Sequence, residues 1–190
     1  YKRQIREYST EALMNTIAFV FQDTHIFAES VYDNIAMHRK VHREDVERAA
    51  KAARCHDFIL TLPKGYDTKL GDGGHKLSGG EAQKIAIARV FVRPYELIIM
   101  DEPSSALDPV AEYELNHSIL NAADRQDRTV IFISHRLSTT RFADRILLFA
   151  NGCLRESGSH DRLMELNGLY AEMFRMQAEK YRRGEEQETA

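Results

Sequence analysis

The stretch Leu97-Ile98-Ile99-Met100-Asp101-Glu102 decides the fold of this 190-residue chain. Its four apolar residues have the length and composition of a strand buried in a parallel sheet. The strand ends at two adjacent carboxylates, Asp101 and Glu102, and open α/β sheets bind their ligands at the carboxyl ends of strands. The stretch therefore predicts an α/β fold with a ligand site at these acids, where one can hold a metal and the other can act on water.

A second informative stretch, Leu77-Ser78-Gly79-Gly80-Glu81, precedes this strand. Ser78 stands where a helix N-cap would, and Glu81 follows at the spacing of a capping box. Gly79 and Gly80 let the backbone approach a ligand closely, and the free N–H groups of a helix start suit phosphate. Either stretch alone has an ordinary explanation, a flexible helix cap or a strand leaving the core. Their order and spacing together are far more specific.

The two stretches together resemble the signature motif and the Walker B strand of the nucleotide-binding domain of ABC transporters. The resemblance implies an α/β fold with a P-loop NTPase-type core, a mostly parallel sheet and an inserted helical subdomain that carries the signature. It implies an ATPase that uses ATP and Mg²⁺ to power transport of a substrate across a membrane. The implied partners are transmembrane domains, on the same or a separate chain, and a second nucleotide-binding domain in a head-to-tail dimer.

The same resemblance assigns roles to residues near the ends of the expected strands. Asp101 would hold Mg²⁺ directly or through water, and Glu102 would polarise the attacking water. Gln22 matches the Q-loop glutamine, which contacts the metal and the water and senses the transmembrane partner. His135 matches the H-loop histidine, which contacts the γ-phosphate. Taken alone, Gln22 is an ordinary polar strand terminator, and a lone histidine is more often structural than catalytic.

Further residues would bind nucleotide across the dimer. In the family, Ser78 and Gly80 of the signature, with Gly79 and Glu81 beside them, bind the γ-phosphate held by the opposite protomer. Asp108 belongs to the matching D-loop, which lies across the dimer interface. Asp108 followed by Pro109 also has a purely local explanation as the start of a helix, and the two interpretations are compatible.

The resemblance divides the chain into four segments: 1–23, a remnant of the ATP-binding core ending in the Q-loop; 24–93, the helical subdomain with the signature; 94–160, the catalytic core; and 161–190, the C-terminal helices and tail. Periodicity and capping signals predict helices at 10–14, 30–35, 44–54, 55–62, 79–92 and 110–123, and strands at 17–21 and 129–133. A hairpin is expected around Asn151-Gly152, then helices at 159–166 and 169–181, and a disordered charged tail at 182–190.

The segment 65–74 is rich in glycine and leads into the signature. Such a segment predicts a loop with unusual backbone angles or close contacts. It resembles the part of ABC exporters that touches the intracellular loops of the membrane domains, although Lys69 stands where many exporters carry an acid. A flexible surface loop is the alternative.

Composition limits the other functions of the chain. Hydrophobic residues make up 43% and charged residues 29%, as in an ordinary globular protein. A formal net charge of −3 gives no support for nucleic-acid binding. The two cysteines lack metal-type spacing, which favours a reducing, cytosolic setting, and no apolar run has the length of a membrane helix. Combined with this cytosolic setting, the resemblance to ABC transporters implies that the chain works at the cytoplasmic face of the cell membrane.

A phosphate-binding loop of the form G-x-x-x-x-G-K-[ST] does not occur in these residues. In the family this loop lies before the Q-loop, so we expect the chain to be a fragment that begins inside a larger protein, or otherwise a degenerate subunit. Two other functions remain open at this point. One is a soluble ABC ATPase that acts on nucleic acid or the ribosome, and the other is a non-catalytic subunit that supplies only a signature face.

Overall fold

The computed structural model describes residues 4–124, 128–137 and 139–188. It divides into two compact units, Tyr1–Ile133 and Ser134–Ala190. The sheet, the helices around it and the signature stretch belong to the first unit, whereas His135 belongs to the second. The four functional segments expected from the sequence are a different kind of division and stay a prediction.

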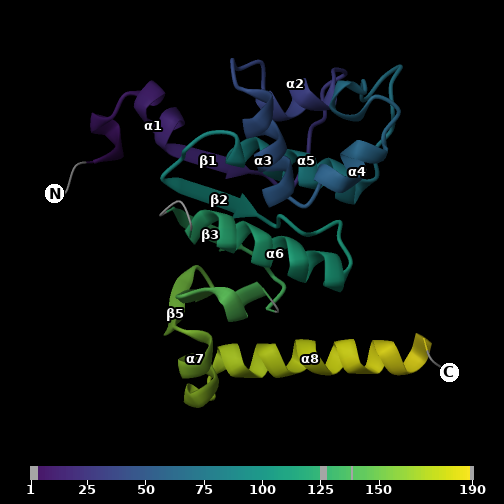
Figure 1. Ribbon diagram of the computed structural model, residues 1–190. Coiled ribbons are helices and arrows are strands. Elements are labelled where there is room, and N and C mark those ends of the chain that lie inside the picture. Colours follow the sequence, from purple (N-terminus) through teal and green to yellow (C-terminus); the bar gives the residue numbers. More distant parts are fainter. Residues whose placement is uncertain (1–3, 125–127, 138, 189–190) are drawn as a thin grey trace. The chain divides into compact units, whose positions relative to one another are not determined.

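The first unit contains a parallel three-stranded sheet (Figure 1). Its strands are β1 (Ile17–Val20), β2 (Leu97–Asp101) and β3 (Thr129–Ile133), in the order β1-β2-β3. The central strand β2 pairs Met100 with Val20 on one side and Asp101 with Ile133 on the other. The predicted buried parallel strand is thus confirmed, and it is flanked on both edges.

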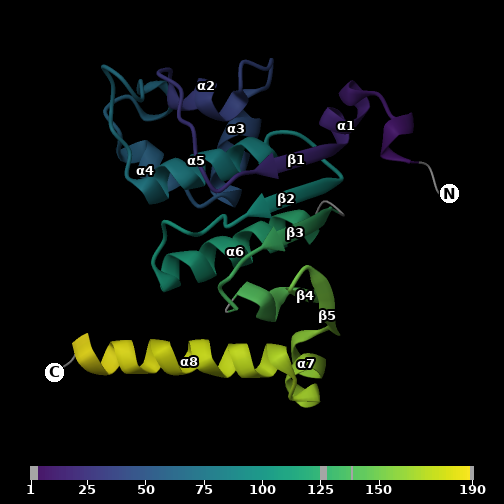
Figure 2. The same cartoon turned by 180° about the vertical axis from the view of Figure 1, so that it is seen from behind.

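Helices of the first unit are α1 (Thr10–Thr16), α2 (Val31–Ala36), α3 (Arg43–Ala52), α4 (His56–Thr61), α5 (Gly79–Phe91) and α6 (Pro109–Asp124), with short 3-10 turns η1 (Ile5–Glu7) and η2 (Gly65–Asp67). All the helices predicted in this region are present. Figure 2, the view from behind, shows α5 and α6 beside the strands. One buried cluster joins Ile98 and Met100 of β2 with Ile85 of α5 and Leu115 and Ile119 of α6.

The other face of the sheet carries exposed apolar side chains. Side chains alternate between the two faces of a strand, so Phe19, Ile99, Asp101 and Ile131 share the face opposite the core. Phe19 is 53% exposed and Ile131 is 45% exposed, although both are apolar. Asp101 therefore leaves the sheet on the side away from the helices of the core.

The second unit has its own small core. It consists of η3 (Thr139–Phe142), a hairpin of β4 (Ile146–Ala150) and β5 (Cys153–Gly158), and helices α7 (His160–Leu166) and α8 (Leu169–Glu188). The hairpin turns at Asn151 and Gly152, both with positive φ, as predicted. The core cluster of the second unit consists of Leu137, Ile146, Leu163 and Tyr170.

The prediction of a disordered tail from residue 182 onward is wrong for the described residues. Helix α8 continues to Glu188. Arg, Glu and Gln dominate its last turns, and these residues have high helix propensity, so the helix does not need apolar partners to continue. Residues 189–190 lie outside the described part of the chain.

Candidate functional site

The two adjacent acids lie at the carboxyl end of β2, as predicted. Asp101 is the last residue of the strand, and the backbone N–H of Glu102 still donates to the carbonyl of Ile133 at 2.9 Å. Glu102 then turns into the left-handed region, with φ of 48°. Non-glycine residues rarely adopt this conformation, and those that do cluster at functional sites. The turn ends the strand directly at Glu102.

A buried glutamine of helix α5 holds the loop that follows. Gln83 is only 2% exposed. Its Nε2 donates to the carbonyl of Glu102 at 3.1 Å and to Oγ of Ser105 at 3.3 Å, and its Oε1 accepts from the N–H of Ala106 at 3.2 Å. The side chain thus joins the signature helix of this chain to the loop that carries its own Glu102.

Helix α6 holds the same loop from its other end. The hydroxyl of Ser104 donates to the carboxylate of Glu112 at 2.8 Å, and both residues are 3% exposed. Asp108 accepts from the N–H groups of Val110 and Ala111 at 3.0 and 2.9 Å, which confirms its predicted capping role. The bond from Ala111 is the main reason that the pKa of Asp108 is lowered. The loop between Glu102 and Asp108 is therefore fixed at both ends.

The signature stretch forms the predicted capping box. Oγ of Ser78 accepts from the N–H of Glu81 at 3.3 Å, and the carboxylate of Glu81 accepts from the N–H of Ser78 at 2.8 Å. A side chain at Gly80 would place its Cβ 2.8 Å from Leu107 Cδ2, and one at Gly79 would lie 3.4 Å from Ala106 Cβ. The two glycines thus have an internal reason, close packing of α5 on the loop after Glu102, besides any ligand.

Gln22 is exposed and lies just beyond β1. Val20 of β1 is paired with Met100 of β2. Gln22 lies two residues after Val20, and Glu102 lies two residues after Met100, so the two side chains follow equivalent positions of neighbouring strands. The chain after Gln22 is fastened to α5 by Arg89, which donates to the carbonyls of His25 and Asn34 at 2.8 and 2.9 Å. Burial lowers the pKa of Arg89. The signature helix therefore contacts both the segment after Gln22 and the loop after Glu102.

His135 lies in the second unit, two residues beyond the end of β3. Its side chain is exposed. The local turn is held by Ser134, whose Oγ accepts from the N–H of Arg136 at 3.0 Å. The predicted position after a strand end is confirmed, whereas the catalytic role of the histidine stays a prediction.

The residues present fit Mg²⁺ that arrives with a nucleotide. Among residues 4–124, 128–137 and 139–188, no three His, Cys, Asp or Glu side chains form a group that could hold a metal by themselves. Mg²⁺ at nucleotide sites needs only one or two carboxylates, because phosphates and water supply the other oxygens. Asp101, partly exposed at the end of a central strand, offers one such carboxylate.

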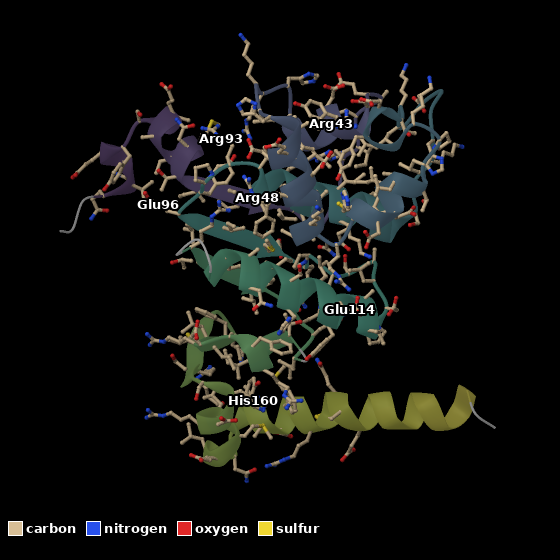
Figure 3. All side chains as sticks on the ribbon, in the orientation of Figure 1. Arg43, Arg48, Arg93, Glu96, Glu114 and His160 are labelled. Carbon is tan, nitrogen blue, oxygen red and sulfur yellow. The ribbon has the colours of Figure 1, made fainter. Side chains whose placement is uncertain are left out.

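Two cavities of the first unit lie elsewhere. One of about 660 Å³ is lined by Arg48, Arg93, Tyr95, Glu96 and Arg128, among others. Arg48, Arg93 and Glu96 are labelled in Figure 3. Glu96 and Arg128 come immediately before β2 and β3, so this cavity is at the amino ends of the strands. The other, of about 280 Å³, is lined by residues of α4, α5 and α6 and their neighbours, such as His56, Lys84 and Glu114.

Sequence reasoning missed the three side chains that hold these loops, Gln83, Glu112 and Arg89. Gln83 and Glu112 stand at fully buried helix positions where an apolar residue is usual. A polar residue at such a position signals a buried hydrogen-bond network, and this signal is present in the sequence. The partners of that network are not, because they lie 19 to 23 residues from Gln83 along the chain.

Comparison with known proteins agrees with this geometry. The model of the family described as "ABC transporter" matches residues 1–105. The ATP-dependent lipid A-core flippase of Desulfotalea psychrophila is 43% identical over 174 residues, which cover 91% of this chain and 30% of the flippase. P-glycoprotein 14 of Caenorhabditis elegans is 40% identical over 174 residues, which cover 91% of this chain and 13% of that protein.

A solved structure of a bacterial Atm1-family ABC exporter with ATP bound is also similar. Its TM-score is 0.83 at 42% sequence identity, over 92% of this chain and 30% of the exporter chain. The chain therefore spans about 30% of the length of these bacterial relatives. Within the described residues, no helix is long and apolar enough to cross a membrane. The family match over more than half of the chain, with the signature and strand motifs in place, shows that the chain belongs to the ABC transporter family.

Proposed function

We propose that this chain is part of a nucleotide-binding domain, and that the complete protein binds and hydrolyses ATP to move a substrate across a membrane. The observation that carries the proposal is the arrangement around Glu102. Two adjacent carboxylates end a central parallel strand, and Gln83 ties the backbone of Glu102 to the helix that is capped by Ser78. The similarity to a flippase and to an exporter supports the proposed transport function.

In this proposal Glu102 polarises the water that attacks the γ-phosphate. The backbone of Glu102 is held by hydrogen bonds to Ile133 and Gln83, so the Cα from which its carboxylate extends is fixed in place. Asp101 lies on the sheet face opposite the core and would hold Mg²⁺, which when bound would neutralise phosphate charge. Gln22 follows the neighbouring strand and would contact the metal and the water. His135 contacts the γ-phosphate.

The proposal also includes a second nucleotide-binding domain, arranged head to tail. The first turn of α5 is exposed at Ser78 and Gly79. The capping box takes up the N–H groups of Ser78 and Glu81, so the N–H groups of Gly79 and Gly80 would meet an anion. Ser78, Gly79, Gly80 and Glu81 would meet the nucleotide of the opposite protomer, with Asp108 at the interface. Transmembrane domains, on the same or another chain, would receive the motion, with this domain at the cytoplasmic face of the membrane.

Mixed dimers of the complete protein test the proposal. One mixture pairs a Glu102→Gln protomer with a Ser78→Arg protomer, which places both defects in one site and leaves the other whole. The second mixture carries both substitutions on one protomer beside a normal one, which damages each site once. The readout is ATP cleaved per dimer in a single turnover, because alternation between sites would stop steady turnover in both mixtures.

We expect the first mixture to cleave one ATP per dimer and the second to cleave none. The Glu102→Gln homodimer should bind ATP and cleave it about 100- to 10,000-fold more slowly, as expected for loss of a general base. Cleavage in the second mixture but not in the first would mean that Ser78 serves the site of its own chain. Normal cleavage in the Glu102→Gln homodimer would refute the base role.

A further inference from the structure

Helix α8 holds the segment that carries His135 at two positions on one helix face. Tyr170 and Gln177 are seven residues apart, which places them on the same side of the helix. Tyr170 is fully buried, and its hydroxyl lies 2.6 Å from Oγ1 of Thr140 and 2.8 Å from Nδ1 of His160. His160, at the start of α7, is labelled in Figure 3. The bond to Thr140 fixes α8 against the segment that follows His135, and the bond to His160 fixes it against α7.

The second position, Gln177, contacts the histidine segment directly. Its Nε2 donates to the carbonyl of His135 at 2.6 Å, and its Oε1 accepts from the N–H of Leu137 at 2.9 Å. One side-chain amide thus binds the C=O of one residue and the N–H of the residue two positions on. A neighbouring strand offers the same pair of bonds, so Gln177 restrains the peptide groups on both sides of Arg136.

This restraint bears on the direction of the His135 side chain. The ring is exposed, so burial in a core does not set its position. The backbone therefore decides where the Cβ of His135 points, and Gln177 holds that backbone. Misplacing a reacting group by about 1 Å can cost about 100-fold in rate, so a small release of this segment is measurable.

Packing does not explain the glutamine equally well. The core cluster of this unit consists of Leu137, Ile146, Leu163 and Tyr170, and Gln177 lies outside it and is only partly buried. Its hydrocarbon portion can be replaced by methionine, which has the same length and similar helix propensity. What methionine cannot replace are the two hydrogen bonds to residues 135 and 137.

We propose that Gln177 is a positioning residue for His135, and that α8 thereby sets how well His135 meets the γ-phosphate of ATP. The inference rests on the proposed ATPase function. Gln177 touches neither nucleotide nor water in this scheme and acts only through the histidine.

The test uses the complete protein with the substitutions Gln177→Met and His135→Ala, alone and combined. Arg175→Met is the matched control, because Arg175 on the same helix makes a side-chain bond of similar length, 2.6 Å, to Asn167 and not to residues 135–137. Two quantities are measured: kcat for ATP hydrolysis, and the ratio of the affinities for a non-hydrolysable ATP analogue and for ADP. The ratio isolates contact with the γ-phosphate and needs no catalysis.

We expect Gln177→Met to lower kcat by about tenfold, since hydrogen bonds of this kind contribute about one factor of ten. The affinity for the ATP analogue should fall while the affinity for ADP stays unchanged, so the affinity ratio should also fall. Arg175→Met should behave as the unsubstituted protein. In the His135→Ala background, Gln177→Met should change the ratio no further. Gln177→Glu keeps the acceptor for the N–H of Leu137 but places a carboxylate oxygen against the carbonyl of His135, so it should lose at least as much as Gln177→Met.

Two results would overturn the inference while leaving the ATPase function intact. One is an unchanged kcat and ratio in Gln177→Met, and the other is an equal further loss of the ratio when His135 is already alanine. If instead His135→Ala alone leaves both hydrolysis and the ratio unchanged, the proposed role of the histidine fails, and the inference fails with it.

Discussion

Two loops of this protein carry the candidate catalytic residues, and they are held in different ways. The loop after Glu102 is held by Gln83, which is only 2% exposed. The side chain of Gln83 makes hydrogen bonds to residues 102, 105 and 106. The His135 segment is held by Gln177, a partly buried glutamine on a helix of the small second unit. The backbone of Glu102 is thus held from the core of the first unit, whereas that of His135 is held by a helix of the second unit.

This comparison predicts that one substitution has different consequences at the two glutamines. Gln83→Met leaves the N–H of Ala106 and the carbonyl of Glu102 without their buried partner, which costs about 3 kcal/mol of local stability. Gln177→Met costs less, about 1 kcal/mol, because its bond to the carbonyl of His135 is exposed and its bond to the N–H of Leu137 is only partly buried. Hydrogen-exchange mass spectrometry of the complete protein, on peptides covering residues 102–107 and 134–140, measures both.

The expected result at Gln83 is about 100-fold faster exchange of the amides of residues 105–107, together with slower ATP hydrolysis. Equal protection losses at the two glutamines would contradict the comparison. A loss confined to residues 134–140 would reverse it.

Local signals in the sequence were sufficient for much of this architecture. The apolar run ending at Asp101 predicted the central strand, the Ser78–Glu81 spacing predicted the capping box, and Asn151-Gly152 predicted the hairpin. Each signal depends on residues within a few positions of one another. Local steric and hydrogen-bonding rules act at that range, which explains why the structure confirms these three predictions.

The supports of the site lay beyond such rules. Gln83 reaches residues up to 23 positions away, and Gln177 reaches back 42. A buried amide signals that partners exist, but only the fold brings the partners near. The left-handed turn at Glu102 is likewise imposed by the loop around it, because glutamate does not favour positive φ by itself. The length of α8 was missed because a charged composition fits both a helix and a tail.

A second pair of substitutions sharpens the contrast between the units. An added Cβ at Gly74 would collide with the backbone carbonyl of Lys69, whereas one at Gly168 would meet the carboxylate of Glu156. A backbone obstacle cannot move aside, so Gly74→Ala should cost about 2 to 3 kcal/mol. The Glu156 carboxylate accepts from the N–H groups of Leu169 and Tyr170 at the start of α8 and can rotate away, at about 1 kcal/mol.

Thermal midpoints of the complete protein with Gly74→Ala or Gly168→Ala measure this difference. Exchange of the amides of residues 169 and 170 should rise only in Gly168→Ala, since only that variant disturbs the carboxylate cap of α8. A smaller loss for Gly74→Ala than for Gly168→Ala would mean that the first unit yields more easily than its backbone contacts suggest.

The smallest expected effect concerns the two cysteines, one in each unit. Cys55 is fully buried in the first unit, and burial raises the pKa of its thiol to about 12 from an ordinary value of 9.0. Above pH 9 the unfolded chain releases this proton while the folded chain keeps it, so folding stability is fully present below pH 9 and is lost between pH 9 and 12. From pH 8 to pH 10 the loss attributable to Cys55 is about 1.4 kcal/mol.

The measurement is the fall in thermal midpoint over that interval, compared with Cys55→Ala, which lacks the titrating group, and with Cys153→Ala, which removes an exposed thiol from the second unit. We expect the fall to be smaller in Cys55→Ala and unchanged in Cys153→Ala, because only the buried thiol resists ionisation in the folded state. An equal fall in all three proteins would show that Cys55 reaches solvent readily, and that the core of the first unit opens more easily than the contacts around Gln83 imply.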